Sequence, residues 1–222
     1  VHGQTGQGVG GTGKWMGMGA SVRLALGLLA AYLLGSIPTS FWVGRAVAGI
    51  DLREHGSKSL GATNLFRVLG WKYAIPVGMF DILKGALPVL VIAPAVSNAP
   101  WVPVLLGATA VLGHVYSVFA GFRGGKGVAT AAGTVAALAP LALLASAVVW
   151  TVVVWVSGYV SLGSILGAVT FPVAAWLLQP GDRYTVAAGV ILAGLIVFTH
   201  RGNIRRLVQG TEARFRQKQA TS

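Results

Sequence analysis

Four polar segments interrupt an otherwise apolar chain of 222 residues and hold most of its chemically useful side chains. They are HGSKSLGATNLFRVLG at 55–70, GFRGGKG at 121–127, GYVSLGS at 158–164 and HRGNIRRL at 200–207. Their side chains include cations, hydroxyls, amides and imidazoles but no carboxylates. Donors of this kind bind anionic oxygens, and phosphate is the anion that they suit best. The sequence therefore points first to phosphate chemistry.

The segment GFRGGKG has the composition of a phosphate-binding loop. Four glycines surround Arg123 and Lys126, so backbone N–H groups can approach an anion while the two cations neutralise it. Lys126 is followed by Gly127 rather than by Ser or Thr, so the magnesium ligand of a Walker A loop is missing. The alternative is a glycine-rich turn whose charges only orient the chain. The residues expected to contact phosphate are Arg123, Gly124, Gly125 and Gly127.

The first polar segment offers a second set of phosphate donors. Ser57, Asn64 and Arg67 supply a hydroxyl, an amide and a guanidinium, and the Arg fork can bind two phosphate oxygens at once. Asn64 and Arg67 are three residues apart and share one face of a helix. We expect both to bind substrate phosphate. The same residues would also suit a capped loop at the membrane surface.

His200 and Asn203 are likewise three residues apart, so they share a helical face where the last apolar run ends. His200 could carry a proton or donate a hydrogen bond, or it could simply lie at the membrane surface. The chain has neither a Gly-x-Ser-x-Gly turn nor a His-x-x-x-x-Asp box. The acids available for a Ser-His-Asp triad on this face are Asp51 and Glu54, and neither is convincing. Cations, amides and groups of the substrate are therefore expected to carry the chemistry.

The composition requires a membrane around the protein. Hydrophobic residues make up 55% of the chain, charged residues make up 10%, and the mean hydropathy is +0.73. This is too little polar surface for a soluble protein of this size. Lys and Arg number 17 against five Asp and Glu, in clusters between apolar runs, which is typical of membrane orientation rather than of a nucleic-acid surface. With no Cys and four His, neither a metal site nor a cofactor is expected.

The apolar runs predict an all-α polytopic membrane protein. They extend over 22–43, 73–96, 101–120, 128–156, 162–178 and 184–199. The run 128–156 is ambiguous, because it is either one long helix or two short helices that meet at Pro140. Asp81 and Lys84 lie inside the second run, where a mutual structural ion pair is the least costly arrangement. The alternative is that Lys84 reaches the active face.

The distribution of positive charge decides the number of spans. With six spans, the basic tail and the first polar loop lie on opposite sides of the membrane, which conflicts with the positive-inside rule. With seven spans, five cations of the first loop, two of GFRGGKG and six of the tail share one side. We therefore predict seven transmembrane helices, two of them short, with the N-terminus outside and the C-terminus in the cytoplasm. The short helices are expected to line the protein interior or a polar cavity.

Three parts of the chain are expected to differ in order. Residues 1–20 are Gly-rich and cannot bury enough surface to fold, so we predict a disordered extension there. Residues 21–210 are expected to form the seven-helix domain. Residues 211–222 are expected to form a basic cytoplasmic tail.

Five longer motifs follow one another between Leu24 and Gly210. They are GSIPTSFWVGR, DLREHGSKSLGATNLFRVLG, DILKGALPV, GHVYSVFAGFRGGKGVAT and HRGNIRRLVQG. In order and spacing they resemble the bacterial acyl-phosphate:glycerol-3-phosphate acyltransferase family. The resemblance implies a membrane enzyme that transfers an acyl chain from acyl phosphate to the 1-hydroxyl of sn-glycerol 3-phosphate. Its products would be lysophosphatidic acid and phosphate, in the first acylation step of bacterial phospholipid synthesis.

The resemblance also implies roles for single residues. It assigns catalytic roles to Ser57, Lys126, His200 and Asn203. It assigns substrate phosphate binding to Arg67 and Ser161. The chain departs from the family pattern at Lys58 and Ser59, where Gly and Asn are more common, and at Gly202, where Glu is common. The first departure affects the expected loop contacts but leaves Ser57 in place.

The implied partners are acyl phosphate, glycerol 3-phosphate and membrane lipid, with a functional hand-off from an enzyme that forms acyl phosphate. The active site is expected on the cytoplasmic face of the bacterial inner membrane. Acyl phosphate is already activated, so the phosphate of the donor is expected to accept the hydroxyl proton while His200 and Asn203 orient the substrate. The rival function is a transporter or channel for an organic phosphate, and a weaker one is a scaffold that binds acidic lipids through the basic tail.

Overall fold

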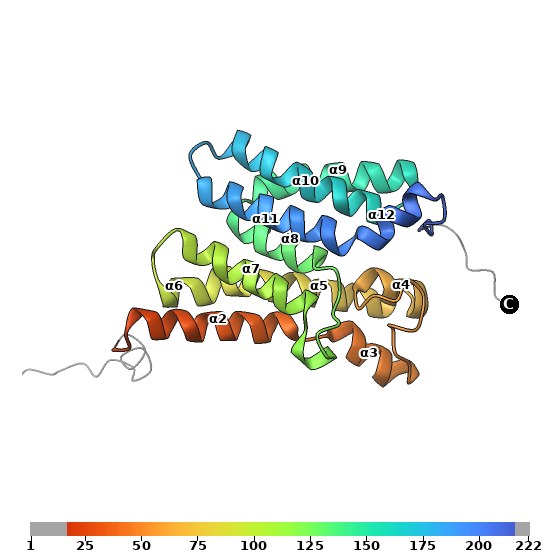
Figure 1. The fold of residues 1–222 in the computed structure, drawn as a ribbon, viewed down its shortest axis with the longest axis horizontal. Helices are drawn as coiled ribbons and strands as arrows, with labels where there is room; N and C mark the ends of the chain where they lie inside the picture. Colours follow the sequence, from red (N-terminus) through yellow and green to blue (C-terminus); the bar gives the residue numbers. More distant parts are fainter. Residues whose placement is uncertain (1–16, 216–222) are drawn as a thin grey trace, which may run out of the picture.

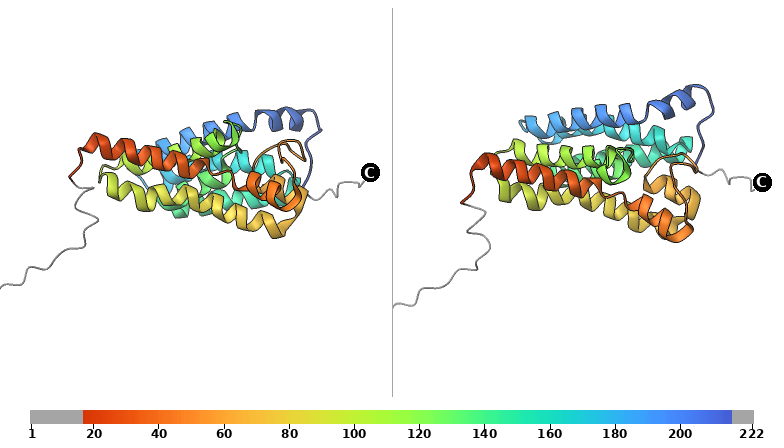
Figure 2. Two further views of the ribbon diagram at one scale, coloured as in Figure 1. Left: turned by 90° about the horizontal axis from the view of Figure 1, so that it is seen from below. Right: turned by 60° about the horizontal axis from the view of Figure 1, so that its bottom comes forward.

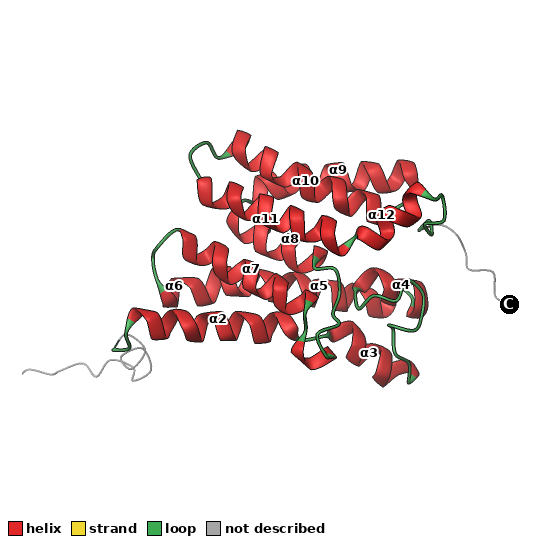
Figure 3. Cartoon of the chain, viewed as in Figure 1, coloured by secondary structure: helices red, strands yellow, loops and turns green. Residues whose placement is uncertain are grey.

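The computed structural model describes residues 17–215, and every regular element in that range is a helix (Figure 3). The predictions for residues 1–16 and 216–222 fall outside the described residues. In chain order, the elements are α2 (Ala20–Ser36), α3 (Thr39–Ala48), α4 (Ala62–Leu69), α5 (Trp71–Leu87), the π-helix η1 (Pro88–Ile92), α6 (Ala93–Val96), α7 (Trp101–Val115), the 3₁₀ turn η2 (Val118–Ala120), α8 (Val128–Leu138), α9 (Pro140–Ser157), α10 (Val160–Leu178), α11 (Arg183–Thr199) and α12 (Arg201–Val208).

Five helical stretches are long and apolar enough to cross a membrane. They are 20–48, 71–96, 101–120, 140–157 and 160–178, and the pair α11 and α12, bent by 59°, is a sixth if it counts as one span. The helix α8 has 11 residues and is shorter than a bilayer requires. The chain is therefore a multi-pass membrane protein with five or six spans by length and composition. The seven-helix count stays a prediction.

The break expected at Pro140 is present. Helix α8 ends at Leu138 and α9 begins at Pro140, where a residue without an N–H is tolerated in the first turn of a helix. The two halves are unequal, because α9 has 18 residues and qualifies as a span by itself. Only α8 is clearly short, and it lies in the middle of the bundle between α5 and α11 (Figure 1).

Small residues let the central helices approach one another closely. A side chain at Gly35 of α2 would collide with the backbone of Ala110 in α7. A side chain at Gly85 of α5 would likewise collide with the backbone of Thr130 in α8. Close backbone approach of this kind is the usual way in which membrane helices gain packing contacts, since lipid supplies no hydrophobic driving force between helices. It fixes α8 against the layer that contains α2, α5 and α7.

A buried ion pair stabilises the break between α2 and α3. Lys84 Nζ lies 2.7 Å from Asp81 Oδ1 and donates to the carbonyl oxygen of Ile37 at 2.8 Å. Thr39 Oγ1 donates to the same carboxylate at 3.0 Å. Ile37 follows the last residue of α2, so Lys84 satisfies a carbonyl at the end of a helix. The structural ion pair predicted from the sequence is confirmed.

The polar segments gather at one end of the bundle. Figure 1 shows α3, α4 and α12 at the same end, away from the loop between α10 and α11. The first and last described residues lie at opposite ends of the long axis, as both views of Figure 2 show. The bundle thus places the four segments that carry chemistry next to one another.

Candidate active site

A cavity of about 410 Å³ runs from this polar end into the middle of the bundle. Its volume lies in the range of small-molecule sites. It joins side chains from all four polar segments, including the predicted residues Ser57, Asn64, Arg67, Lys126, Gly127, Ser161, His200 and Asn203. Most of the remaining lining residues are apolar and come from α8, α9, α10 and α11. The cavity therefore has a polar mouth and an apolar interior.

A chain of hydrogen bonds connects the polar residues of the mouth. Lys126 Nζ donates to Asn203 Oδ1 at 2.6 Å, and Asn203 Nδ2 donates to Glu212 Oε1 at 2.6 Å. Ser161 Oγ donates to the same carboxylate oxygen at 2.7 Å, and Arg206 Nε donates to Oε2 at 2.7 Å. Glu212 thus bonds the segments 158–164 and 200–207 directly and is linked to GFRGGKG through Asn203.

Glu212 is the site residue that sequence reasoning missed. The sequence predicted no convincing carboxylate on this face, and that expectation was wrong, because Glu212 is only 7% exposed at the mouth of the cavity. Burial raises the pKa of this carboxyl, but hydrogen bonds from Ser161, Asn203 and Arg206 outweigh burial, so its pKa is lowered overall. Its one signal was that it is the single acid in the basic segment after residue 200.

Lys126 is the ammonium group closest to the centre of this network. It extends from the glycine-rich loop, and burial together with the cations of Arg206 and Arg67 lowers its pKa to about 8, against the opposing effect of Glu212. A phosphate bound beside it would restore the stability of the charged form. The ammonium is therefore arranged to respond to an anionic ligand.

Arg67 extends from α4 toward the same mouth. Its guanidinium donates to the carbonyl oxygen of Ala213 at 3.5 Å, and burial lowers the pKa of the group. Arg67 and Lys126 both line the cavity and reach it from different halves of the chain. The two carboxylates that line the cavity, Asp81 and Glu212, are each paired with another cation, Lys84 and Arg206. The charges of Arg67 and Lys126 therefore remain in excess, which suits a phosphorylated ligand.

His200 lies at the junction of α11 and α12 and is only 2% exposed. Its Nδ1 lies 2.8 Å from the carbonyl oxygen of Ile196. Because a carbonyl oxygen can only accept, we assign the hydrogen of the neutral ring to Nδ1, which leaves Nε2 as an acceptor. His200 lines the cavity, so this acceptor is available to a ligand hydroxyl.

Asn64 holds the first polar loop in shape. Its Oδ1 accepts from the Ser57 N–H at 2.7 Å, and its Nδ2 lies 3.0 Å from the carbonyl oxygens of Leu52, His55 and Ser59. An amide with these partners has little capacity left for substrate. The structure thus gives Asn64 a positioning role beside Ser57 in place of the expected phosphate contact.

The glycine-rich loop differs from the predicted phosphate cradle. The N–H groups of Gly124 and Gly125 donate to the carbonyls of Val115 and His114, at 3.0 and 3.1 Å, so they are not free for an anion. Arg123 is exposed, and none of these three residues lines the cavity. Gly127 does line it, with φ of +83°, and begins the first turn of α8. The first N–H groups of a helix lack intrahelical partners, so this turn is the better anion donor.

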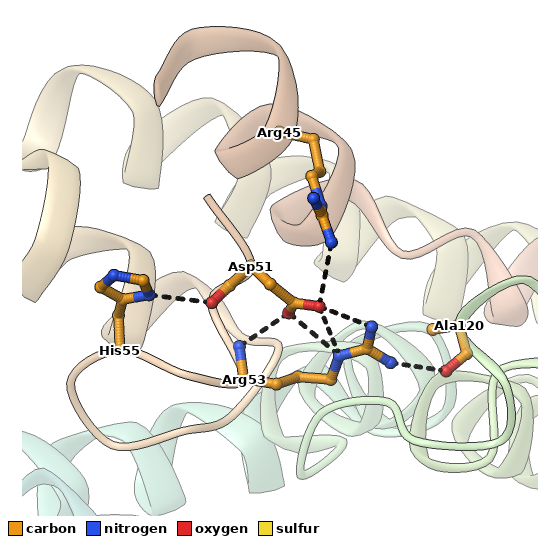
Figure 4. A network of polar contacts seen from close by, with 5 residues as sticks. All are labelled: Arg45, Asp51, Arg53, His55 and Ala120. Atoms are coloured by element: carbon orange, nitrogen blue, oxygen red, sulfur yellow. Dashed lines mark hydrogen bonds and ion pairs between the residues drawn. The ribbon is translucent and has the colours of Figure 1, made fainter. Parts of the chain in front are cut away.

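A separate ion-pair network fastens the loop before α4 (Figure 4). Asp51 receives three hydrogen bonds from the Arg53 guanidinium, of which the shortest is 2.6 Å, and its carboxylate lies 3.4 Å from the Arg45 guanidinium. Arg53 also donates to the carbonyl of Ala120 at 3.0 Å. The hydrogen bonds with Arg53 lower the pKa of Asp51 to about 2. Asp51 therefore has a structural role and is not an acid of a catalytic triad.

The residues that follow α12 close the site like a strap. The N–H of Phe215 donates to the carbonyl of Gly158 at 2.7 Å, and its ring stacks on Phe66 of α4 with centroids 4.9 Å apart. The segment 211–215, called the strap below, thus contacts α4 on one side and the loop before α10 on the other. It places Glu212 between them.

Comparison with known proteins agrees with this geometry. A family model described as glycerol-3-phosphate acyltransferase matches residues 25–210. The chain belongs to this family. A glycerol-3-phosphate acyltransferase from Bacillus cytotoxicus is 45% identical over 194 residues, which cover 86% of this chain and 96% of the relative. Another from Chlorobaculum parvum is 41% identical over 218 residues, with 84% and 94% covered.

Two solved structures of integral membrane glycerol 3-phosphate acyltransferases are similar in fold. The glycerol 3-phosphate form superposes with a TM-score of 0.80 at 40% identity, and the lysophosphatidic acid form with 0.78 at 37% identity. Each alignment covers 86% of this chain and 94% of the other. Members of the glycerol-3-phosphate acyltransferase family are acyltransferases, so this chain is an enzyme.

Proposed function

We propose that the cavity transfers an acyl chain from acyl phosphate to the 1-hydroxyl of sn-glycerol 3-phosphate. The observation that carries the proposal is one continuous cavity with a cationic mouth and an apolar interior. A lipid-soluble acyl chain and two phosphorylated groups fit these two regions. Relatives solved with glycerol 3-phosphate and with lysophosphatidic acid support the same acceptor and product.

In the proposed reaction, the hydroxyl oxygen of glycerol 3-phosphate attacks the acyl carbonyl carbon. An ester C–O bond forms, the C–O bond to the phosphate of the donor breaks, and inorganic phosphate leaves. Negative charge grows on the departing phosphate, so a cation fixed beside it lowers the barrier. Lys126, Arg67 and the first turn of α8 supply that stabilisation, and the network through Asn203 keeps Lys126 in position.

The proton of the hydroxyl passes to the departing phosphate of the donor. Glu212 is a poor base for this step, because its pKa is lowered and both its oxygens already accept hydrogen bonds. His200 Nε2 accepts the hydrogen bond of the attacking hydroxyl and orients it. The phosphate oxygens of the donor lie next to the reacting centre because the phosphate is bonded to the acyl carbon. They can take the proton without a further protein group.

The proposed topology has seven transmembrane helices with α8 as the short one, the N-terminus outside and the site on the cytoplasmic side of the inner membrane. The opposite positions of the first and last described residues support an odd number of crossings (Figure 2). The gathering of basic segments at one end supports its cytoplasmic location. Glycerol 3-phosphate then arrives from the cytosol, and an enzyme that forms acyl phosphate hands over the donor.

The proposal is tested with the purified chain in detergent, palmitoyl phosphate and glycerol 3-phosphate. We expect lysophosphatidate and phosphate to form in equal amounts, with no product when palmitoyl-CoA replaces palmitoyl phosphate. Uptake of glycerol 3-phosphate into proteoliposomes without chemical conversion would favour a transporter instead. Absence of lysophosphatidate from a folded preparation would remove the proposal.

A further inference from the structure

The apolar interior of the cavity has a definite depth. On α10, the lining residues follow one helical face from Ser161 through Ser164, Gly167 and Ala168 to Phe171. From Ser161 to Phe171 the helix rises about 15 Å, at about 1.5 Å per residue. This is roughly half of a 30 Å hydrocarbon core. The cavity therefore stops well inside the membrane on this helix.

The neighbouring helices end their contribution at the same level. Helix α11 is antiparallel to α10, and its deepest lining residue is Gly189. The last lining residue of α8 is Val135, three positions before that helix ends, and the first of α9 is Leu143, three positions after that helix begins. Four helices thus close the cavity together, and we call Val135, Leu143, Phe171 and Gly189 the floor.

Phe171 fills the floor because Gly189 makes room for it. Phe171 is 4% exposed, and a Cβ atom at Gly189 would lie 2.7 Å from its ring. Leu192, one turn from Gly189 on the same helix, is buried in the same core cluster as Phe171. An aromatic ring held between packed helices is not free to swing away from a ligand, since protein interiors are close-packed.

We propose that Phe171, seated against Gly189, sets the length of acyl chain that the enzyme accepts. The inference rests on the proposed acyl transfer. The carbonyl carbon of the donor must lie at the cationic mouth. The acyl chain can therefore extend only over the distance between the mouth and the floor. A longer chain meets the Phe171 ring, and a shorter chain leaves apolar surface unfilled. Each mismatch lowers kcat/KM because a pocket discriminates roughly tenfold or more per unfavourable methylene.

The alternative to the deep path toward the floor is a lateral path, by which the acyl chain would leave the cavity between two helices. Ile82 of α5 and Trp150 of α9 also line the cavity, and both side chains are exposed. A chain that left between these helices would extend into the bilayer without reaching the floor. The deep path is favoured because the floor region is apolar, enclosed on four helices and continuous with the mouth.

The first test measures kcat/KM for saturated acyl phosphates of increasing length with two opposite variants. Phe171→Ala removes the ring and is expected to move the length at which kcat/KM falls toward longer chains, with about a tenfold gain for the first rejected homologue. Ala168→Leu narrows the cavity above the floor and is expected to move the length at which kcat/KM falls toward shorter chains. Matched controls on the lipid-facing side of α11, Phe198→Ala and Ala187→Leu, are expected to leave the profile unchanged.

The second test needs no variant, so misfolding cannot obscure it. Palmitoyl phosphate with a photoreactive diazirine at its terminal carbon is bound to the wild-type enzyme and irradiated. Adducts on the floor residues or Leu192 are expected, whereas adducts at Ile82 or Trp150 would overturn the proposal. An unchanged length profile in active Phe171→Ala and Ala168→Leu enzymes would also overturn it. Labelling of the floor without any acyl transfer would leave the binding path of the acyl chain standing and would contradict the proposed reaction.

Discussion

Lys126 and Arg123 are two cations of one short loop that the structure separates completely. Lys126 bonds Asn203 inside the cavity, and Arg123 is exposed outside it. We expect Lys126→Ala to lower kcat/KM by about 100-fold, in line with the loss of one charge-stabilising donor. Arg123→Ala is the matched control and should change kcat/KM by less than about threefold. Steady-state assays with both variants measure this, and equal losses would contradict the geometry.

The lowered pKa of Lys126 predicts a pH dependence. As pH rises through about 8, the ammonium of the free enzyme loses its proton and with it the attraction for phosphate. Bound phosphate stabilises the ammonium, so KM should rise above pH 8 while kcat changes little. Lys126→Arg keeps its charge at these pH values and should move this alkaline limb to higher pH. A wild-type kcat/KM that stayed level from pH 7 to 9.5 would contradict the assignment.

Glu212 stabilises the site through its charge. Its pKa is lowered, so its contribution is present above the ordinary carboxyl pKa and is lost as pH falls through the lowered value. Glu212→Gln should cost about 1–3 kcal/mol at pH 7, because Arg206 loses its ionic partner. Thermal unfolding in detergent at pH 7 and at acid pH measures the difference from wild type. That difference should shrink on acidification, and a constant difference would argue for a purely steric effect.

At the scale of single residues, the sequence was a good guide to which side chains lie together and a poorer guide to the role of each one. Ser57, Arg67, Lys126, Ser161, His200 and Asn203 stood out because cations and amides next to glycine are unusual in an apolar chain, and all of them line the cavity. Asn64 and Gly124 have the same chemistry but bond their own loops. Residue type cannot distinguish a side chain that binds a ligand from one that bonds its own loop, because either partner satisfies a polar group equally well.

Helix α8 is the element whose position depends most on glycine. A Cβ atom at Gly85 of α5 would collide with the Thr130 carbonyl, so Gly85→Ala must push α8 away and should cost about 1–3 kcal/mol. Gly194 of α11 has nothing within 4 Å of an added Cβ, and Gly194→Ala should be neutral or slightly stabilising. Melting temperatures of the two variants in one detergent test this. Equal melting temperatures would contradict the role given to the α5–α8 contact.

The elements were largely predictable, and their lengths were less so. Hydrophobic runs located the long apolar helices to within a few residues but not α4 and α12, which lie in polar segments. Pro140 located the break between α8 and α9, because proline removes a backbone donor. The first run is predicted to end at Val43, but the helical stretch continues through α3 to Ala48 after the break at Pro38. Lys84 satisfies the Ile37 carbonyl oxygen at this break, and such a long-range contact leaves no local pattern in the sequence.

For the whole molecule, the orientation in the membrane can be tested because the chain has no cysteine. A cysteine introduced at Asn98, in the exposed turn between α6 and α7, should react with an impermeant maleimide on intact cells. A cysteine at Gln209, after α12, should react only after the membrane is opened. Both variants are read by gel shift. The reverse pattern would contradict the proposed cytoplasmic location of the site.

The position of Glu212 in the strap also affects the order in which the site forms during synthesis of the protein. Every helix within residues 17–215 precedes it in the chain, so a ribosome delivers this bundle to the membrane before it delivers the carboxylate. Until then, Asn203, Ser161 and Arg206 lack the partner that joins them, and the strap has not crossed to Gly158 and Phe66. We therefore expect the hydrogen-bond network of the mouth to be completed only after the helices have been inserted into the membrane.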